Sequence, residues 1–385
     1  MQHETPSLPL PAAPPANLDQ ALDWLRLIRS PRVGPATFQR LMAEHGSAAA
    51  ALAELPAIAA SAGAKAYSAC PLDRAQAEYA AGRKAGARLI CLGSTLYPAD
   101  LAQVPDAPPV LWVTGRIELL QCPSVALVGA RNASSLGTRM AKLLAADLGK
   151  AGFAVVSGLA RGIDAAAHWA SLDTGTIAVL AGGIDQIYPP ENRGLAEKIA
   201  ESGLLMSEQP VGLTPQARHF PRRNRLVSGL ARVVVVVEAA ARSGSLITAR
   251  DALDQGREVM AVPGHPLDAR ASGCNNLLRD GALLVRSAAD ILAHLAAPVE
   301  RTAPTVPVPQ PTPQPKPAAP PGKSIAGALD LSRRILSLLG PTPVSEDQLI
   351  RDLNIPAQTV SRELVSLELE GKLTRKSGGM LALPV

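Results

Sequence analysis

The segment from Ser124 to Ser157 decides the fold, and it reads SVALVGARNASSLGTRMAKLLAADLGKAGFAVVS. Two short, uninterrupted apolar runs, SVALVG and FAVVS, lie on either side of a helix expected from about Ser135 to Lys150. Continuous apolar runs are typical of strands buried on both faces, and strands that alternate with helices are typical of parallel sheets. The segment therefore predicts a βαβ unit.

The same alternation continues toward the C-terminus. Further apolar runs of strand length are TIAVLA, GLLMSE, RVVVVVEA and EVMAVP, separated by helical segments or loops. Gly and Ser collect just after several of these runs. The pattern predicts an α/β domain with a doubly wound parallel sheet, which we place at residues 91–297.

The chain before the sheet has a different pattern. Residues 1–17 are rich in Pro and Ala, and we expect a disordered tail rather than a signal peptide. Residues 18–90 have helical spacing, with one helix in LDQALDWLRLIRS and a second in VGPATFQRLMAEHG, between Gly34 and Gly46. Two helices joined by a Gly-containing turn resemble a helix-hairpin-helix or SAM-like unit; a plain helical packing module is the alternative.

The chain after the sheet predicts a linker and a small domain. Residues 298–323 are rich in Pro and should form an extended linker of polyproline character. Residues 324–385 predict three helices, LSRRILSLL, VSEDQLIRDL and AQTVSRELVSLELEG, and a hairpin in LTRKSGGMLAL, which is the winged-helix pattern. The third helix carries more Glu than Arg, so we expect it to contact a protein, or DNA only weakly.

Composition limits the possible partners. The 385 residues are 47% hydrophobic and 3% aromatic, and the net charge of +5 permits an anionic partner without requiring one. The four cysteines are widely spaced and are expected to be buried free thiols, so we predict no metal site and no cofactor. The longest apolar runs are of strand length, which predicts no membrane span and a cytoplasmic protein.

A basic segment, RHFPRRNR, occupies residues 218–225 and contains no Asp or Glu. Guanidinium groups bind phosphate oxygens in a forked geometry, and the ring of Phe220 offers a face on which a base can stack. The segment predicts a site for single-stranded nucleic acid, with a solvated basic turn as the alternative.

Small residues follow the predicted strands, at the edge of the sheet where open parallel sheets bind ligands. Exposed backbone N–H groups in such loops bind anions. Arg131 and Arg161 each stand just past a strand end, so we expect both in one crevice. The loops are VGARNASS, SGLARGIDAAAH, AGGIDQIYPP and EAAARSGSLITA.

These loops disfavour a nucleotide cofactor. The dinucleotide fingerprint requires three glycines after the first strand, and only Gly129 is present there. The second strand ends in Ser157 and Gly158 instead of the acid that binds a ribose hydroxyl, and no P-loop pattern occurs in the sequence.

No catalytic set is evident among the acidic and histidine residues after the strands. We expect His168 to be packed or to cap a helix, and Asp164 to cap the helix that begins near it. Glu238 ends an apolar strand and is a weaker candidate for a catalytic carboxylate. The sequence therefore predicts no enzyme activity.

Several motifs in order resemble one known family, that of the DNA-processing protein DprA, also called Smf. The resemblance covers roughly residues 90–296, and the flanking helical and winged-helix units resemble those of longer members. The motifs are GAR, SGLARGID, FPRRNRLVSGL, EAAARSGSLITA, AVPGHP and GCNNLLRDGA, preceded by LYPADLAQVPDAPPVLWVTG.

The resemblance implies an extended Rossmann-like fold that forms homodimers through this domain. It also implies a protein that binds and shields single-stranded DNA and loads RecA onto it during natural transformation. The implied DNA pocket comprises Gly129, Arg131, Ser157, Gly158, Arg161, Gly162, Phe220, Arg223, Asn224, Arg225, Ser243, Gly244, Ser245 and Thr248, with Arg218 and Arg222 as flanking phosphate contacts.

Two other functions remain open on the sequence. A nucleotide-processing hydrolase of the phosphoribohydrolase kind has a similar sheet, but its PGGxGT-type motif has two adjacent glycines that the loop Arg242–Thr248 lacks. A sequence-specific transcription factor would use the winged helix and would protect duplex DNA.

Overall fold

The computed structural model describes residues 13–61, 67–296 and individual positions between Leu331 and Ala382. The chain divides into two compact units, Met1–Glu300 and Arg301–Val385, and each is described by itself. The predicted linker at residues 298–323 and most of the predicted tail lie outside the described residues.

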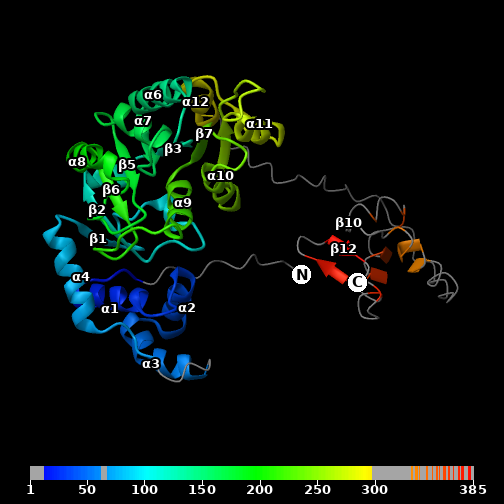
Figure 1. Ribbon diagram of the computed structural model, residues 1–385. Coiled ribbons are helices and arrows are strands. Elements are labelled where there is room, and N and C mark those ends of the chain that lie inside the picture. Colours follow the sequence, from blue (N-terminus) through cyan, green and yellow to red (C-terminus); the bar gives the residue numbers. More distant parts are fainter. Residues whose placement is uncertain are drawn as a thin grey trace, which may run out of the picture. The chain divides into compact units, whose positions relative to one another are not determined.

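Within the described residues, a nine-stranded sheet forms the centre of the first unit (Figure 1). Its order is β1-β2-β6-β5-β4-β3-β7-β8-β9, so the chain moves outward from β3 in both directions, as predicted for a doubly wound sheet. The strands that pair in parallel are β3 (Ser124–Gly129), β4 (Ala154–Ser157), β5 (Thr176–Val179), β6 (Leu204–Ser207), β7 (Val233–Glu238), β8 (Glu258–Ala261) and β9 (Leu283–Leu284).

One edge of the sheet differs from the parallel prediction. β1 (Arg88–Cys91) pairs antiparallel with β2 (Val110–Gly115), and β2 pairs antiparallel with β6. The segment between β1 and β2 contains the one-turn helix α5 (Ala99–Ala102) instead of a crossover helix, so the chain returns in the opposite direction. Because β1 begins at Arg88, the sheet starts inside the predicted helical domain.

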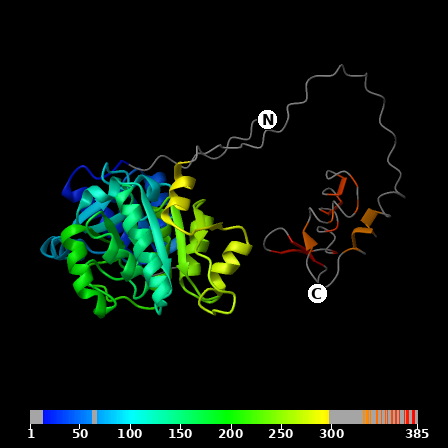
Figure 2. The ribbon, with the colours of Figure 1, turned by 90° about the horizontal axis from the view of Figure 1, so that it is seen from above.

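Helices cover both faces of the sheet (Figures 1 and 2). Successive residues of β3 point to opposite faces: Val125 and Leu127 pack in one cluster, and Ala126 and Val128 in the other. The first face carries α6 (Ser135–Lys150), α7 (Ile163–Ala170) and α12 (Ala288–Ala296); the second carries α8 (Arg193–Ser202), α9 (His219–Leu230), α10 (Ser245–Asp254) and α11 (Ser272–Arg279).

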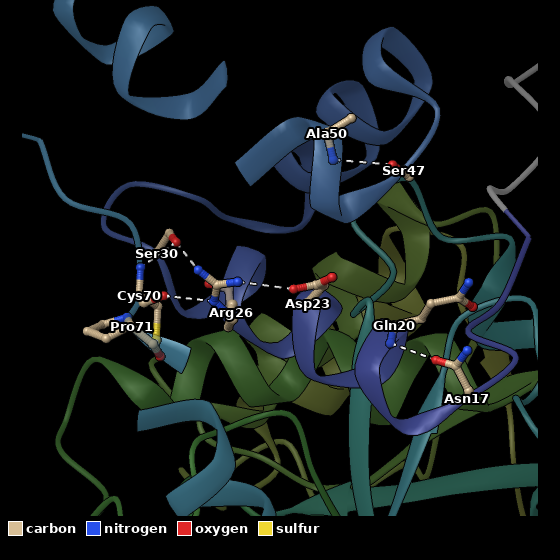
Figure 3. Close-up of polar contacts among 9 residues, drawn as sticks. All are labelled: Asn17, Gln20, Asp23, Arg26, Ser30, Ser47, Ala50, Cys70 and Pro71. Atoms are coloured by element: carbon tan, nitrogen blue, oxygen red, sulfur yellow. Dashed lines mark hydrogen bonds and ion pairs between the residues drawn. The ribbon is translucent and has the colours of Figure 1, made fainter. Parts of the chain in front are cut away.

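The N-terminal helices include the two that were predicted. Asn17 caps the first, since its side chain accepts the N–H of Gln20 (Figure 3). Gly46 ends the second in the left-handed conformation. Arg26 and Ser30 both bond the backbone of Cys70, which ties a distant segment to the first helix (Figure 3). The helices are α1 (Leu18–Arg29), α2 (Pro35–His45), α3 (Ala48–Ser61) and α4 (Leu72–Lys84).

A partly buried carboxylate joins these helices to the sheet. Glu78 on α4 accepts hydrogen bonds from Arg29 on α1 and from Nε1 of Trp112 on β2, each at 3.0 Å. The ring of Trp112 lies so close to Gly82 that a Cβ there would overlap it. The helical domain is therefore packed against the edge of the sheet.

One cysteine does not follow the prediction. Cys70, Cys91 and Cys274 are buried, whereas Cys122 is exposed. Burial raises the pKa of the Cys91 thiol to about 12. Cys122 ends the short 3₁₀ helix η1 (Ile117–Gln121) in the turn before β3, where the chain runs over the surface.

The second unit has the predicted C-terminal hairpin. β11 (Thr374–Lys376) pairs antiparallel with β12 (Met380–Ala382). β10 (Val344–Ser345) also pairs with β12, so the start of the second predicted helix is a strand instead. Leucines, isoleucine and valine from all three predicted helices form the core: Leu331, Ile335, Leu349, Leu353, Val360, Leu364 and Leu367, with Leu381 from the hairpin.

Candidate nucleic-acid interface

An open cavity of about 940 Å³ lies at the carboxyl ends of β3, β4 and β7. The chain winds in opposite directions on the two sides of β3, which is where open α/β sheets bind ligands. A smaller cavity of about 220 Å³ adjoins it and shares the wall formed by Arg131, Tyr188, Phe220 and Arg223. We call the two together the crevice.

Most of the pocket residues predicted from the sequence line this crevice. They come from the ends of three strands and from the first turns of α9 and α10, which are far apart in the chain. Arg161 lines the small cavity with Arg131, as expected. The large cavity is lined by Gly129, Arg131, Gly158, Phe220, Arg223, Asn224, Ser243, Gly244, Ser245 and Thr248.

Other predicted residues lie outside the two cavities. Ser157 is fully buried, and its hydroxyl donates to the carbonyl oxygen of Leu127 at 2.6 Å. Gly162 lies in the turn before α7, where a Cβ would overlap the backbone of Ala130. Arg218 and Arg222 are exposed at the start of α9, in positions that suit flanking contacts.

Arg225 faces away from the crevice. Its guanidinium forms ion pairs with Glu208 and with Asp106, the latter at 3.1 Å. Successive helical residues are about 100° apart, so Arg225 projects from nearly the opposite side of α9 to Arg223. Since both partners hold its guanidinium, Arg225 positions α9 and does not line the pocket.

Arg223 forms part of the floor of the crevice. Nη1 donates to the carbonyl oxygen of Val179 at 3.1 Å, and the side chain covers Gly158 so closely that a Cβ there would overlap it. Nε has no hydrogen-bond partner. Burial lowers the pKa of Arg223 to about 10, so the guanidinium remains charged at neutral pH.

Asp164 lies beside Arg223, and its carboxylate accepts the N–H groups of Gly158, at 3.1 Å, and Ala160, at 3.3 Å. It therefore closes the turn between β4 and α7, which corrects the prediction that it caps its own helix. Burial raises the pKa of Asp164, while the charge of Arg223 opposes the rise.

Phe220 is half-buried in the first turn of α9, near a cation and a second aromatic ring. The guanidinium carbon of Arg131 lies 5.4 Å from the centre of the Phe220 ring, within range of a cation–π interaction. The centre of the Tyr188 ring lies 5.3 Å from that of Phe220, and the two ring planes are inclined by 56°. Tyr188 was not predicted as a site residue, although it stands in the predicted strand-end loop AGGIDQIYPP.

The first turn of α10 forms the opposite wall. Helix α10 begins at Ser245 without a side-chain cap from Gly244, and a helix N-terminus favours an anion. The hydroxyl groups of Ser243 and Ser245 lie 2.7 Å apart and bond each other. The N-terminal end of α10 therefore adds positive potential to the cavity.

Two further cations, Arg242 and Arg270, line the large cavity and were not predicted. Arg242 lies within the strand-end loop EAAARSGSLITA, so the sequence could have indicated it as a site residue. Arg270 lies after β8, outside the motifs of the sequence, and only the tertiary structure brings it to the cavity. Among the described residues that line the large cavity, Asp164 is the one acidic residue, and the charge of Arg223 acts on it. The lining is therefore strongly positive.

The histidine considered as a catalyst has a structural role, as predicted. His168 is fully buried, and Nδ1 lies 2.7 Å from the hydroxyl of Thr176 while Nε2 faces the N–H of Leu159. The Thr176 hydroxyl donates to Val155, so Nδ1 is assigned as the donor to Thr176. Burial lowers the pKa of His168 to about 3, which keeps the ring neutral.

Glu238, the other residue considered as a catalyst, also has a structural role through its hydrogen bonds. Its carboxylate accepts the N–H of Ser134 at 2.9 Å and also the Ser134 hydroxyl, which holds the loop between β3 and α6.

Among the described residues, no group of His, Cys, Asp and Glu could hold a metal ion. None of the helices described is long and apolar enough to span a bilayer.

Comparisons with protein families assign all three parts of the chain. The model described as DNA recombination-mediator protein A matches residues 88–296. The DprA-like N-terminal HHH domain matches residues 18–81, and the DprA winged helix domain matches residues 311–379. The HHH match favours the helix-hairpin-helix interpretation of the N-terminal helices.

Individual relatives agree with these matches. Protein Smf of Synechocystis is 37% identical over 314 residues, covering 73% of this chain and 76% of that protein. DNA processing protein DprA of Streptococcus pneumoniae is 45% identical over 199 residues, which are 51% of this chain and 70% of that protein.

Solved structures show the same fold. The crystal structure of DprA from Streptococcus pneumoniae superposes with a TM-score of 0.52 at 42% identity, over 54% of this chain and 74% of that chain. A structure that concerns the single-stranded DNA binding mode of DNA processing protein A from Helicobacter pylori superposes with a TM-score of 0.50 at 30% identity, over 54% of this chain and 95% of that chain. On the domain matches, the relatives and the shared fold, this chain belongs to the family of the DNA recombination-mediator protein A, also named DprA or Smf.

Proposed function

We propose that this protein binds single-stranded DNA without regard to sequence, shields it, and loads the RecA recombinase onto it during DNA uptake and natural transformation. The observation that supports this most is the crevice, in which arginines and a half-buried phenylalanine meet at one edge of the sheet. Arginines bind phosphates, and an aromatic ring stacks on the face of a base. Every nucleotide has a phosphate and a base face, so these contacts do not depend on the sequence.

The charged groups are arranged to hold phosphates. Arg131, Arg242 and Arg270 are exposed around the large cavity, and Arg223 is buried in its floor with Nε unpartnered. A desolvated guanidinium makes strong charge-assisted hydrogen bonds to phosphate oxygens. The N-terminal end of α10 faces the same space and adds backbone dipoles of the same sign.

The lining offers little with which to read a base edge. Among the described residues, the amide side chains that line the large cavity are Asn132 and Asn224, and Asn224 is directed at the carbonyl oxygen of Gly244, 3.5 Å away. Sequence readout needs several bidentate contacts to base edges. Binding through phosphates and one ring is therefore expected to tolerate any sequence.

The partners in this proposal follow from the family. The Helicobacter pylori structure concerns single-stranded DNA binding by a relative, and we extend that activity to this chain. RecA loading is extended on the same ground, as is a homodimer through the Rossmann-like domain. Support for the dimer comes from β9, an edge strand whose Leu283 and Leu284 are 41% and 48% exposed.

Salt dependence tests the DNA assignment. Each phosphate neutralised on a single strand contributes about −0.7 to the slope of log affinity against log salt concentration, so roughly three to five arginine contacts predict a slope of about −2 to −3.5. Fluorescence anisotropy with thymidine oligomers at several salt concentrations measures this slope. A slope near zero, or equal affinity for a mononucleotide and a thirty-mer, would rule the assignment out.

The dependence of affinity on strand length and a second assay, base release, distinguish this proposal from the hydrolase alternative. A phosphoribohydrolase binds one nucleotide, releases its base and shows little dependence on strand length. Base release from nucleoside monophosphates, measured by chromatography, would support that alternative over ours. The bonds from Ser134 to Glu238 count against it, because they occupy the carboxylate that would act there.

A further inference from the structure

Tyr188 is an aromatic residue of the crevice to which the family motifs give no role. It belongs to the loop after β5 and lines both the large and the small cavity. It is 48% exposed, although its ring contacts Phe220. A half-exposed ring leaves apolar surface in water that a ligand can cover.

The scarcity of aromatic residues makes this position informative. The chain contains three Phe, three Trp and four Tyr, and Trp24, Phe38, Tyr97 and Trp112 are buried in the core. Two of these few rings, Tyr188 and Phe220, meet at the edge of one positively charged crevice. Aromatic rings beside cations are the usual means by which proteins hold single-stranded nucleic acid.

The geometry of the two rings suits two separate bases. Their centres are 5.3 Å apart and their planes are inclined by 56°. Stacked bases in a strand rise by about 3.4 Å, so these rings are too far apart and too inclined to continue one base stack. The two rings instead suit two adjacent bases that are unstacked from each other, with one base on Phe220 and the other on Tyr188.

The small cavity provides the charges that a second nucleotide needs. Arg131, Arg161 and Arg223 all line it beside Tyr188. Arg161 pairs with Glu191 at 3.6 Å, and both side chains are about 60% exposed. An exposed pair of this kind is weak, so a phosphate oxygen can replace Glu191 as the partner of Arg161.

We propose that Tyr188 is a second base-stacking residue and that the small cavity is the subsite for the nucleotide next to the one on Phe220. This inference rests on the proposed single-stranded DNA binding and defines its smallest unit as two adjacent nucleotides. Phe220 holds one base at the large cavity, and Tyr188 holds its neighbour at the small one.

Three substitutions at Tyr188 test the role of its ring. Tyr188→Ala removes it, Tyr188→Leu keeps apolar bulk against Phe220 without an aromatic face, and Tyr188→Phe keeps the ring. Trp169→Ala is the matched control, since Trp169 is 46% exposed on α7 and lines neither cavity. Each full-length variant is titrated by competition anisotropy with a thymidine dodecamer and with an abasic dodecamer, which has phosphates but no bases.

The expected result separates stacking from packing. Tyr188→Ala and Tyr188→Leu should each weaken binding of the thymidine dodecamer about 5- to 150-fold, the range for one lost base stack. Tyr188→Phe and Trp169→Ala should bind it as the unmodified protein does. None of the four variants should change affinity for the abasic dodecamer.

Three outcomes would overturn the inference. Binding of Tyr188→Leu at the unmodified level would show that the residue only supports Phe220, and equal losses on both dodecamers would show a structural role. Unchanged affinity of Tyr188→Ala for thymidine would remove the second subsite and leave the proposed function intact. Failure of the unmodified protein to bind the thymidine dodecamer would instead overturn the proposed function.

Discussion

Nη1 of Arg223 occupies the space in which a side chain at Gly158 would lie, so any larger residue at the end of β4 would have to displace this guanidinium of α9. The guanidinium also bonds Val179 at the end of β5. Arg223 thus joins two strand ends to the helix that carries Phe220. These two contacts fix the position of Arg223 in the floor of the crevice.

Replacing Gly158 with Ala should therefore damage both stability and binding. The added methyl group must displace Arg223, and overpacking of this kind typically costs about 1–3 kcal/mol. Urea unfolding measures the loss of stability, and anisotropy measures the loss of single-strand affinity. Gly34→Ala is the control, because a Cβ at Gly34 has nothing within 4 Å; equal behaviour of the two variants would contradict the prediction.

Arg131→Ala should weaken binding without unfolding the protein. Arg131 is exposed, and losing a charge-assisted phosphate contact is expected to cost about 1.5–3 kcal/mol of binding free energy. Titration of the folded variant measures this cost. Arg139→Ala removes an exposed cation on α6 that lines neither cavity, and its affinity should stay close to that of the unmodified protein.

Phe220→Ala should cost roughly 1–3 kcal/mol of binding free energy if a base stacks there. Phe220→Tyr keeps the ring and should cost much less. Affinities of the two variants for a thymidine oligomer provide the comparison. Equal losses from both would indicate that Phe220 acts by packing against Arg131 and Tyr188.

Arg223→Ala should give a pH-dependent loss of stability. Arg223 is buried beside Asp164, so its removal leaves a buried carboxylate whose raised pKa rises further. When the pKa of a carboxyl is higher in the folded than in the unfolded state, its contribution to stability is fully present at a pH below the unfolded-state pKa. That contribution is lost as the pH rises through the folded-state pKa. Urea unfolding should show a smaller difference from the unmodified protein at pH 4 than at pH 7.5; a difference independent of pH would exclude the coupling.

A chain ending at residue 297 should fold and bind single-stranded DNA. The described residues that line the crevice all fall between Val128 and Arg270, within the first compact unit, Met1–Glu300. Thermal unfolding and anisotropy of the shortened chain check the expectation. Aggregation, or loss of most of the affinity, would show that the C-terminal unit contributes to the core or to the site.

The sequence alone determined the parallel part of the sheet and the position of the crevice. Apolar runs such as Val233–Val237 have one stable location, between two layers of helices, because nothing else buries both faces of a strand. The carboxyl ends of parallel strands meet at one edge, so the Gly- and Ser-rich loops after them had to converge there. Both conclusions rest on local patterns, the apolar runs and the Gly- and Ser-rich segments after them, which can be recognised in the sequence without knowledge of long-range contacts.

Only the tertiary structure decided how the basic segment at residues 218–225 is used. Its arginines are adjacent in sequence, but the turn of α9 sends Arg223 into the floor of the crevice, Arg225 to Glu208, and Arg222 into solvent. The antiparallel edge of β1 and β2 and the arrival of Tyr188 and Arg270 at the crevice were likewise fixed by long-range packing. A run of charges specifies composition, whereas the direction of each side chain depends on the helix that carries it and on the surfaces that the helix packs against.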